Sequence, residues 1–135
     1  MTPAISVIVC DVDETLSDMS PMGERFSEVG APAELAKLWF ASLLRDGFAL
    51  TASGDNGSFA AIGADALRGL LTGMKLNRPL EAAVDHVMGG MAGLGVHPDV
   101  PGGIRALAAA GFRLMTLSHG SAQIADDPET RREAE

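Results

Sequence analysis

Two carboxylates and a hydroxyl follow one another closely near the start of the chain, in the run Asp11-Val12-Asp13-Glu14-Thr15. An aspartate carboxylate can attack an electrophilic centre and form an ester, and a second carboxylate can donate and accept the proton. Ser118, far along the chain, could hydrogen-bond the transferred group. These residue types predict group transfer to Asp11 as nucleophile, with Asp13 as acid and base. The alternative from spacing alone is a pair of carboxylates that form a turn or cap a helix after a strand.

Two predicted strands would bring these residues together. The apolar, β-branched run before Asp11 predicts a buried strand over about residues 4–10, and a similar run predicts a second strand over residues 112–117 that ends at Ser118. If the strands are parallel neighbours, their carboxyl ends meet at one edge of the sheet, where open α/β proteins bind ligands. We therefore expect Asp11, Asp13, Thr15 and Ser118 to converge there.

The chain between the strands reads as helical. Apolar spacing, with Pro near helix starts and Gly near helix ends, predicts helices over about residues 21–29, 32–52, 59–71 and 79–92. Ser20 would cap the first, with Pro21 at its first position. A turn at residues 98–101 and a short helix over 102–110 lead to the second strand, and residues 122–135 read as a helix that becomes a charged tail. The predicted fold class is α/β, with a partial core of residues 1–18 and 96–135 and an all-helical insertion of residues 19–95.

Composition narrows the function and the compartment. The 135 residues are 47% hydrophobic and 21% charged, which is typical of a globular protein. A net charge of −8 argues against nucleic acid or a phospholipid surface as partner, whereas a small anionic substrate needs only a locally positive site. The single Cys10 cannot form an internal disulfide, which indicates a reducing compartment. No basic leader and no apolar run of about 18 residues is present, so we expect a cytoplasmic protein with no membrane partner.

The motifs resemble those of the haloacid dehalogenase (HAD) superfamily of hydrolases. Asp11–Thr15 matches its first motif and Leu114–Ser118 its second, while the helical insertion is similar to the cap of the L-2-haloacid dehalogenase branch. The resemblance covers about residues 4–124. It implies a partial Rossmann-like core of parallel strands with a helical cap, and hydrolysis of a small 2-haloacid through an aspartyl-enzyme intermediate. The site residues that it implies are Asp11 and Asp13 for catalysis and Thr15, Phe40, Ser118 and His119 for substrate binding.

Three positions depart from the dehalogenase pattern and keep a second reaction open. Asp13 stands where the dehalogenases carry Tyr, and an Asp there is typical of the superfamily's magnesium-dependent phosphatases, in which Asp11 and Asp13 would bind Mg²⁺. Phe40 stands where the dehalogenases carry the Arg that cradles the halide, and His119 stands where Asn is usual. The alternatives are therefore a 2-haloacid dehalogenase that needs no metal and a Mg²⁺-dependent phosphatase of a small metabolite.

The superfamily's third and fourth motifs have no clear match. Lys37 and Lys75 both lie in the insertion, and Asp126-Asp127 resembles the acidic fourth motif only in composition. We therefore expect a chain truncated after the second motif, with an open strand edge that favours self-association or a dimer. A catalytically incomplete fragment or a binding remnant is the remaining alternative. His86 and His97 lack metal-ligand spacing and are expected to be structural.

Overall fold

The computed structural model describes residues 4–118 and divides them into two compact units. The boundaries fall between Met19 and Ser20 and between Gly93 and Leu94. We call residues 4–19 and 94–118 the sheet unit and residues 20–93 the helical unit. In residues 4–118, no helix is long and apolar enough to cross a membrane.

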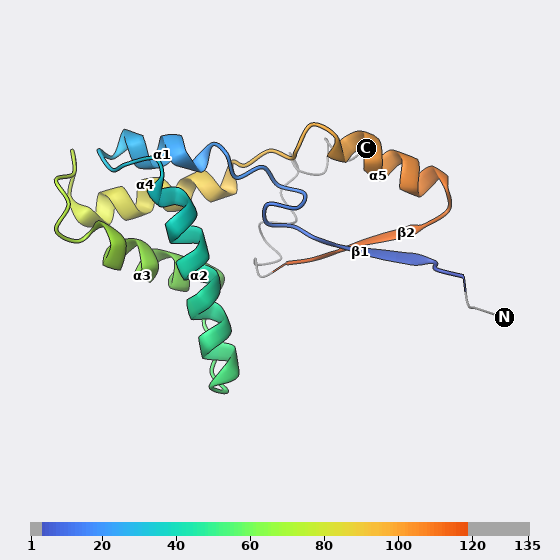
Figure 1. Ribbon diagram of the computed structural model, residues 1–135, viewed down its shortest axis with the longest axis horizontal. Helices are drawn as coiled ribbons and strands as arrows, with labels where there is room; N and C mark the ends of the chain where they lie inside the picture. The colour runs from blue at the N-terminus through green and yellow to red at the C-terminus, as the bar shows by residue number, and fades with distance from the viewer. Residues whose placement is uncertain (1–3, 119–135) are drawn as a thin grey trace. The chain divides into compact units, whose positions relative to one another are not determined.

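The sheet unit consists of two parallel strands and one helix (Figure 1). Strand β1 (Val7–Asp11) pairs with β2 (Arg113–Leu117) in a register that runs from Val7 opposite Arg113 to Asp11 opposite Leu117. Helix α5 (Val100–Ala109) precedes β2 and packs against it. Because parallel strands need a crossover connection, the long excursion between β1 and β2 is a requirement of the pairing. The predicted α/β class with parallel strands is confirmed.

Four helices form the helical unit: α1 (Met22–Glu28), α2 (Leu35–Ala52), α3 (Phe59–Leu71) and α4 (Leu80–Ala92). Helix α1 packs on α2 and α4, and α3 packs on the same two helices. Their shared apolar core holds every hydrophobic side chain that is buried in the described chain, namely Met22, Phe26, Val29, Ala31, Trp39, Leu43, Leu67, Leu71, Ala83, Val84 and Val87. The helical unit therefore has a core of its own.

Trp39 lies at the centre of this core. Its indole is fully buried, 6.0 Å from the Phe26 ring between centroids, and its Nε1–H donates to the Gly63 carbonyl at 2.9 Å. A buried indole N–H needs such an acceptor, because an unpaired one would cost free energy. The absence of a side chain at Gly63 lets the indole pack close to the backbone of α3. A Cβ there would lie 3.6 Å from the indole ring and 3.3 Å from the Met88 side chain. The predicted helices thus pack through one aromatic anchor.

Several predicted boundaries are wrong, and each error concerns a proline. Pro21, not Ser20, occupies the N-cap of α1, and no side chain caps that helix. Helix α2 starts at Leu35 rather than Pro32, after a turn in which Leu35 N–H donates to the Pro32 carbonyl. Helix α5 starts at Val100 and takes Pro101 into its first turn, where the missing N–H costs nothing. The tail predicted for residues 122–135 lies outside the described residues.

Candidate active site

Asp11 ends β1 at the edge of the sheet where β2 also ends. Asp11 lies opposite Leu117 in the parallel register, so Ser118 follows β2 directly at the same edge. The Asp11 residue is exposed, and its Oδ2 accepts a hydrogen bond of 2.9 Å from the Thr15 hydroxyl. The structure therefore brings the predicted nucleophile, Thr15 and the end of the second motif to one edge.

A tight turn around one carbonyl explains why Thr15 reaches back to Asp11. The Val12 carbonyl oxygen accepts backbone N–H groups from Thr15 at 3.2 Å and from Leu16 and Ser17 at 2.9 Å each. The Ser17 hydroxyl donates to the same oxygen at 3.2 Å. These bonds wrap residues 13–17 around the end of the strand, and the wrap returns the Thr15 side chain to the carboxylate four residues before it.

Glu14 adopts a left-handed backbone conformation within this turn, with φ of 60°. This conformation costs a non-glycine residue about 1 kcal/mol or more. The Glu14 carboxylate lies by the second chain segment: its Oε2 accepts the Met19 backbone N–H at 3.0 Å, and its Oε1 lies 3.7 Å from the His97 Nε2. Glu14 therefore braces the loop through its contacts with Met19 and His97.

His97 joins a group of possible metal ligands that its sequence position did not indicate. One ligand atom each from Glu14, Asp18 and His97 lies within 4.8 Å of the others, and this is the one such group of three or more in residues 4–118. The cause is an antiparallel bridge between Ser17 and Val96, which brings the two segments side by side. Contacts with Glu14 are enough to explain the position of the His97 ring, because its Nε2 also lies 3.3 Å from the Glu14 carbonyl oxygen. We assign this group no metal.

Asp11 offers its carboxylate and Asp13 its backbone carbonyl as hard oxygen ligands, which suit Mg²⁺. Across residues 4–118, no third His, Cys, Asp or Glu joins these two in a set of possible ligands. Two protein oxygens do not form an all-protein cage. They fit a site in which substrate phosphate oxygens and water would complete the ligand shell of Mg²⁺.

The other predicted site residues are placed separately or not at all. Phe40 is half-buried in α2 of the helical unit, next to the buried Trp39. His119 lies outside the described residues. Contacts of Phe40, Thr15, Ser118 and His119 with a substrate stay predictions.

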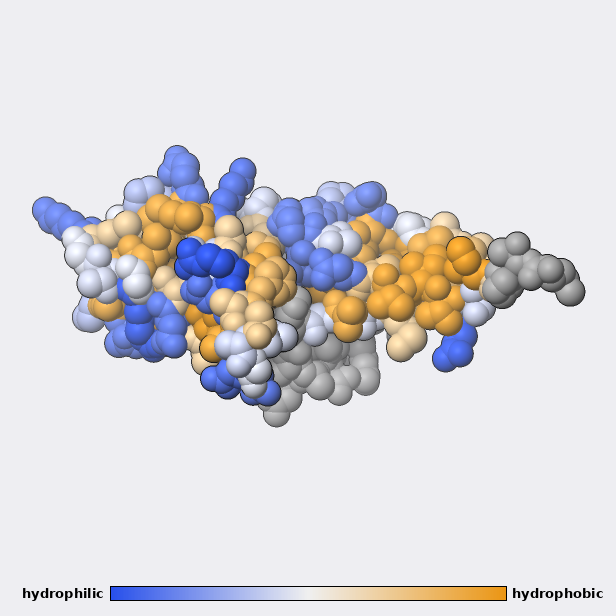
Figure 2. All heavy atoms as spheres, turned by 60° about the horizontal axis from the view of Figure 1, so that its bottom comes forward, coloured by the Kyte–Doolittle hydropathy of each residue, from blue (hydrophilic) through white to orange (hydrophobic). Residues whose placement is uncertain are grey.

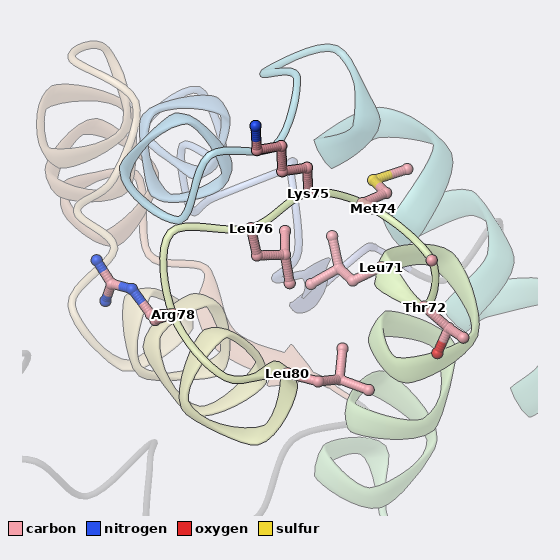
Figure 3. Close-up of a pocket in the computed structure, with 8 residues that line it drawn as sticks. Leu71, Thr72, Met74, Lys75, Leu76, Arg78 and Leu80 are labelled. Carbon is pink, nitrogen blue, oxygen red and sulfur yellow. The ribbon is translucent and has the colours of Figure 1, made fainter.

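A pocket of about 320 Å³ belongs to the helical unit and contains none of the predicted site residues. Figure 3 shows Leu71, Leu76 and Leu80 lining its interior, with the charged ends of Lys75 and Arg78 directed away from it. The three leucines face the interior and the two cations point outward, so this pocket has no connection with the chemistry predicted for Asp11.

Solved structures share this arrangement of strands and helices, whereas no family model and no curated protein sequence matches the chain. A dehalogenase superposes with a TM-score of 0.80 and 25% identity over 99% of this chain and 57% of its own. A second structure, an L-2-haloacid dehalogenase, gives a TM-score of 0.82 with 23% identity over 97% of this chain and 59% of its own. The chain has the haloacid dehalogenase fold.

The predicted resemblance is thereby confirmed at the level of the fold. A further neighbour, the L-2-haloacid dehalogenase from Xanthobacter autotrophicus with chloropropionic acid covalently bound, has a TM-score of 0.77 and 18% identity. The superposition covers 97% of this chain and 52% of the Xanthobacter enzyme. The chain therefore spans a little over half of the length of the haloacid dehalogenases that it resembles.

Proposed function

We propose that this chain carries the nucleophile of a haloacid dehalogenase-like hydrolase, and that Asp11 attacks a small 2-haloacid. The observation that carries the proposal is the hydrogen bond from Thr15 to Asp11 Oδ2 at the carboxyl edge of a sheet with the haloacid dehalogenase fold. The covalently bound haloacid in a structural neighbour supports a covalent intermediate of this kind.

The first step is a displacement at carbon. The Asp11 oxygen Oδ1, which is not the acceptor of the Thr15 hydroxyl, attacks the carbon that bears the halogen. A carbon–oxygen bond forms as the carbon–halogen bond breaks, and halide leaves with the bonding electrons. The Thr15 hydrogen bond fixes the rotation of the carboxylate, so that the attacking oxygen is oriented before the substrate binds.

The second step is hydrolysis of the ester on Asp11. Oδ2 is now the carbonyl oxygen of the ester, and it becomes an oxyanion when water adds to the carboxyl carbon. The Thr15 hydroxyl donates to that oxygen and stabilises the charge as it develops. The carbon–oxygen bond at the carboxyl carbon then breaks, which releases a 2-hydroxy acid and a proton and restores the carboxylate. Asp13 is the nearest acid and base in sequence for these proton transfers.

The second candidate is a phosphatase of a small metabolite, and Asp13 is the residue that favours it. The same Asp11 carboxylate would attack phosphorus, and Asp13 would protonate the leaving oxygen. Mg²⁺ held by the Asp11 carboxylate and the Asp13 backbone carbonyl would neutralise charge on the phosphoryl group, which leaves the Asp13 carboxyl free for proton transfer. The two candidates share the nucleophile and differ in the metal.

The test is single-turnover hydrolysis in water enriched with ¹⁸O. In the dehalogenase, water that opens the ester at the carboxyl carbon places one ¹⁸O atom in the Asp11 carboxylate, which mass spectrometry of the peptide around residues 4–20 detects. In the phosphatase, water attacks phosphorus and the ¹⁸O atom leaves in the phosphate. Halide release from L-2-chloropropionate with a chelator present would support the dehalogenase. Phosphate release from a small phosphate ester that stops with chelator would support the phosphatase instead.

Asp11→Ala should abolish the activity and the label. Asp85→Ala is the matched control, because Asp85 is exposed on α4 and lies outside the site. Turnover that survives in Asp11→Ala would contradict the proposal for both reactions, and label absent from the Asp11 carboxylate of a protein that releases halide would contradict the dehalogenase.

A further inference from the structure

The loop after β1, which orients the nucleophile, belongs to a unit without a buried core. We call residues 12–17 the nucleophile loop. Among residues 4–19 and 94–118 no residue is buried, and Figure 2 shows apolar side chains of the two strands at the surface. Hydrophobic stabilisation is roughly proportional to the apolar area removed from water, so burial contributes little to holding this loop. Polar contacts must hold it in one conformation instead.

The chain segment that returns from the helical unit supplies such contacts through its backbone. An antiparallel bridge joins Ser17 to Val96, and the His97 N–H donates to the Leu16 carbonyl at 3.0 Å. The His97 carbonyl in turn accepts the Val100 N–H, at the start of α5, at 3.0 Å. The backbone of His97 is thus held between the nucleophile loop and α5, whatever its side chain does.

The His97 side chain reaches the same loop at Glu14. Its Nε2 lies 3.3 Å from the Glu14 carbonyl oxygen and 3.7 Å from Glu14 Oε1. A carbonyl oxygen can only accept a hydrogen bond, so Nε2 carries a proton and donates it. The His97 side chain is 29% exposed and that of Glu14 53%, so the longer contact with the carboxylate contributes little in water. The bond to the carbonyl is therefore the contact that bears on the loop.

That bond completes the support of a single peptide group. The Glu14 carbonyl and the Thr15 N–H belong to the same planar trans peptide and point in opposite directions. The N–H donates to the Val12 carbonyl at 3.2 Å and the carbonyl accepts from His97, so the peptide is held on both sides. A peptide plane held in this way fixes the position of Thr15 and directs its hydroxyl towards Asp11.

The conformation of Glu14 explains why the peptide needs this support. Its φ of 60° is left-handed, which is unfavourable for a residue with a side chain. Without a donor to its carbonyl, the peptide would be free to rotate and to carry Thr15 away from Asp11. Glycine adopts a positive φ about as readily as a negative one. The need for His97 should therefore depend on the residue at position 14.

We propose that His97 is a positioning residue for the nucleophile. Its Nε2–H holds the peptide between Glu14 and Thr15, and through that peptide it keeps the Thr15 hydroxyl where it donates to Asp11 Oδ2. The role needs no contact between His97 and the reacting atoms. Its consequence for catalysis rests on the proposed hydrolase, whereas its effect on the nucleophile loop does not.

Steady-state turnover tests the catalytic consequence, with halide release from L-2-chloropropionate or phosphate release from a small phosphate ester as the readout. His97→Ala should lower kcat by about tenfold and leave KM within about twofold, because the nucleophile loses its orientation while substrate contacts stay. His97→Gln should keep kcat within about twofold of the wild type, since its amide offers a donor in place of Nε2. Asp99→Ala is the matched control on the same segment. Asp99 is exposed and its side chain caps no N–H of α5, so both constants should stay at wild-type values.

Replacing Glu14 separates positioning from direct contact with the substrate. In a Glu14→Gly background, His97→Ala should lower kcat by less than about threefold, since glycine adopts the left-handed conformation unaided. A loss of about tenfold that persists in this background would mean that His97 acts on the substrate and would overturn the positioning role. His97→Gln as impaired as His97→Ala would overturn it as well.

Hydrogen exchange measured by NMR follows the nucleophile loop without any turnover. The amides of Thr15, Leu16 and Ser17 share the Val12 carbonyl, so their exchange reports opening of the loop. His97→Ala should speed their exchange by about three- to tenfold, and His97→Gln by less than about twofold. Unchanged exchange in His97→Ala would overturn the role assigned to His97. Faster exchange in a chain that shows no turnover would support that role and contradict only the proposed hydrolase.

Discussion

A single hydroxyl decides how the Asp11 carboxylate is held. Thr15 donates to Oδ2 because the chain between the two residues wraps around the Val12 carbonyl. The wrap needs Glu14 in the left-handed conformation, and the Glu14 carboxylate is in turn held by the Met19 N–H. The geometry at the nucleophile therefore depends on neighbours that do no chemistry themselves.

Replacing Thr15 tests this dependence. Thr15→Val keeps the shape of the side chain and removes the donor to Oδ2, and a hydrogen bond to a charged group contributes about 1.5–3 kcal/mol. In the proposed hydrolase we expect kcat to fall by roughly 10- to 100-fold. Thr15→Ser keeps the hydroxyl and should stay near the wild type, as measured by steady-state product release.

Thr51→Val is the matched control for that series. Thr51 donates its hydroxyl to the Gly47 carbonyl within α2, so the same chemical change occurs on an exposed helix of the other unit. Its kcat should be unchanged. Equal losses in Thr15→Val and Thr51→Val, or full activity in Thr15→Val, would remove the role assigned to the Thr15 hydroxyl.

Polar contacts at the end of α1 join it to α4 and to the loop before α4. The Glu28 carboxylate hydrogen-bonds the His86 ring of α4, and the Glu28 carbonyl accepts from the Asn77 amide at 2.9 Å and from Arg78 at 2.8 Å. Gly30 follows with φ of 88°, where a side chain would be strained and its Cβ would lie 3.3 Å from the Asn77 nitrogen. These contacts fix the end of α1 against α4 and the loop before α4.

The Glu28 contacts predict an acid-sensitive helical unit. The hydrogen bond from His86, followed by the charges of Arg25, His86 and Arg78, holds the pKa of Glu28 below its usual 4.5. Arg68 likewise lowers the pKa of Glu81 through its hydrogen bond. A carboxyl pKa lowered by folding contributes stability that is present above the unfolded pKa and lost as the pH falls through the folded value.

Thermal melts from about pH 7 down to pH 3 check this sign. The midpoint of the helical unit should fall with pH below about 4.5, and Glu28→Gln should make that fall shallower. Glu24→Gln, on an exposed position of the same helix, should leave the slope of the wild type. A Glu28→Gln slope as steep as the wild type would show that Glu28 has no part in it.

The helices could be predicted from the sequence where the spacing of the apolar residues agrees with the capping and turn residues at the helix ends. Helix α3 runs over Phe59–Leu71 as predicted, because Ser58 accepts the Ala61 N–H as a cap and apolar residues recur at helical spacing. The prolines at 21, 32 and 101 misled the boundaries. A proline is tolerated in the first turn or just before it, and the sequence pattern does not distinguish those places.

The candidate site was predictable only in part, for reasons of distance along the chain. The position of Asp11 and Ser118 at the same edge of the sheet could be predicted, because each follows or ends a strand and the carboxyl ends of parallel neighbours lie together. The contact between His97 and Glu14 could not be predicted. These residues are 83 positions apart, and the bridge between Ser17 and Val96 brings them together. That bridge depends on tertiary structure and has no local signal.

At the scale of the whole molecule, burial is divided unequally between the two units. The helical unit has Trp39, Phe26 and Leu43 fully buried, whereas the sheet unit leaves Val9 and Met115 more than half exposed. Units with cores of such different size should open with different free energies. The nucleophile thus lies in the unit that its own packing stabilises less.

Hydrogen exchange followed by mass spectrometry tests this division. At about 1 µM, amides of α2, α3 and α4 should be better protected than those of β1 and β2, because local opening is easier where few apolar contacts must break. Leu43→Ala should lower the protection of the helical unit, since a buried Leu→Ala change costs about 2–5 kcal/mol. It should leave β1 and β2 unchanged if the units open separately. Equal protection of both units in the wild type, or loss in the strands of Leu43→Ala, would mean that the chain folds as one cooperative body.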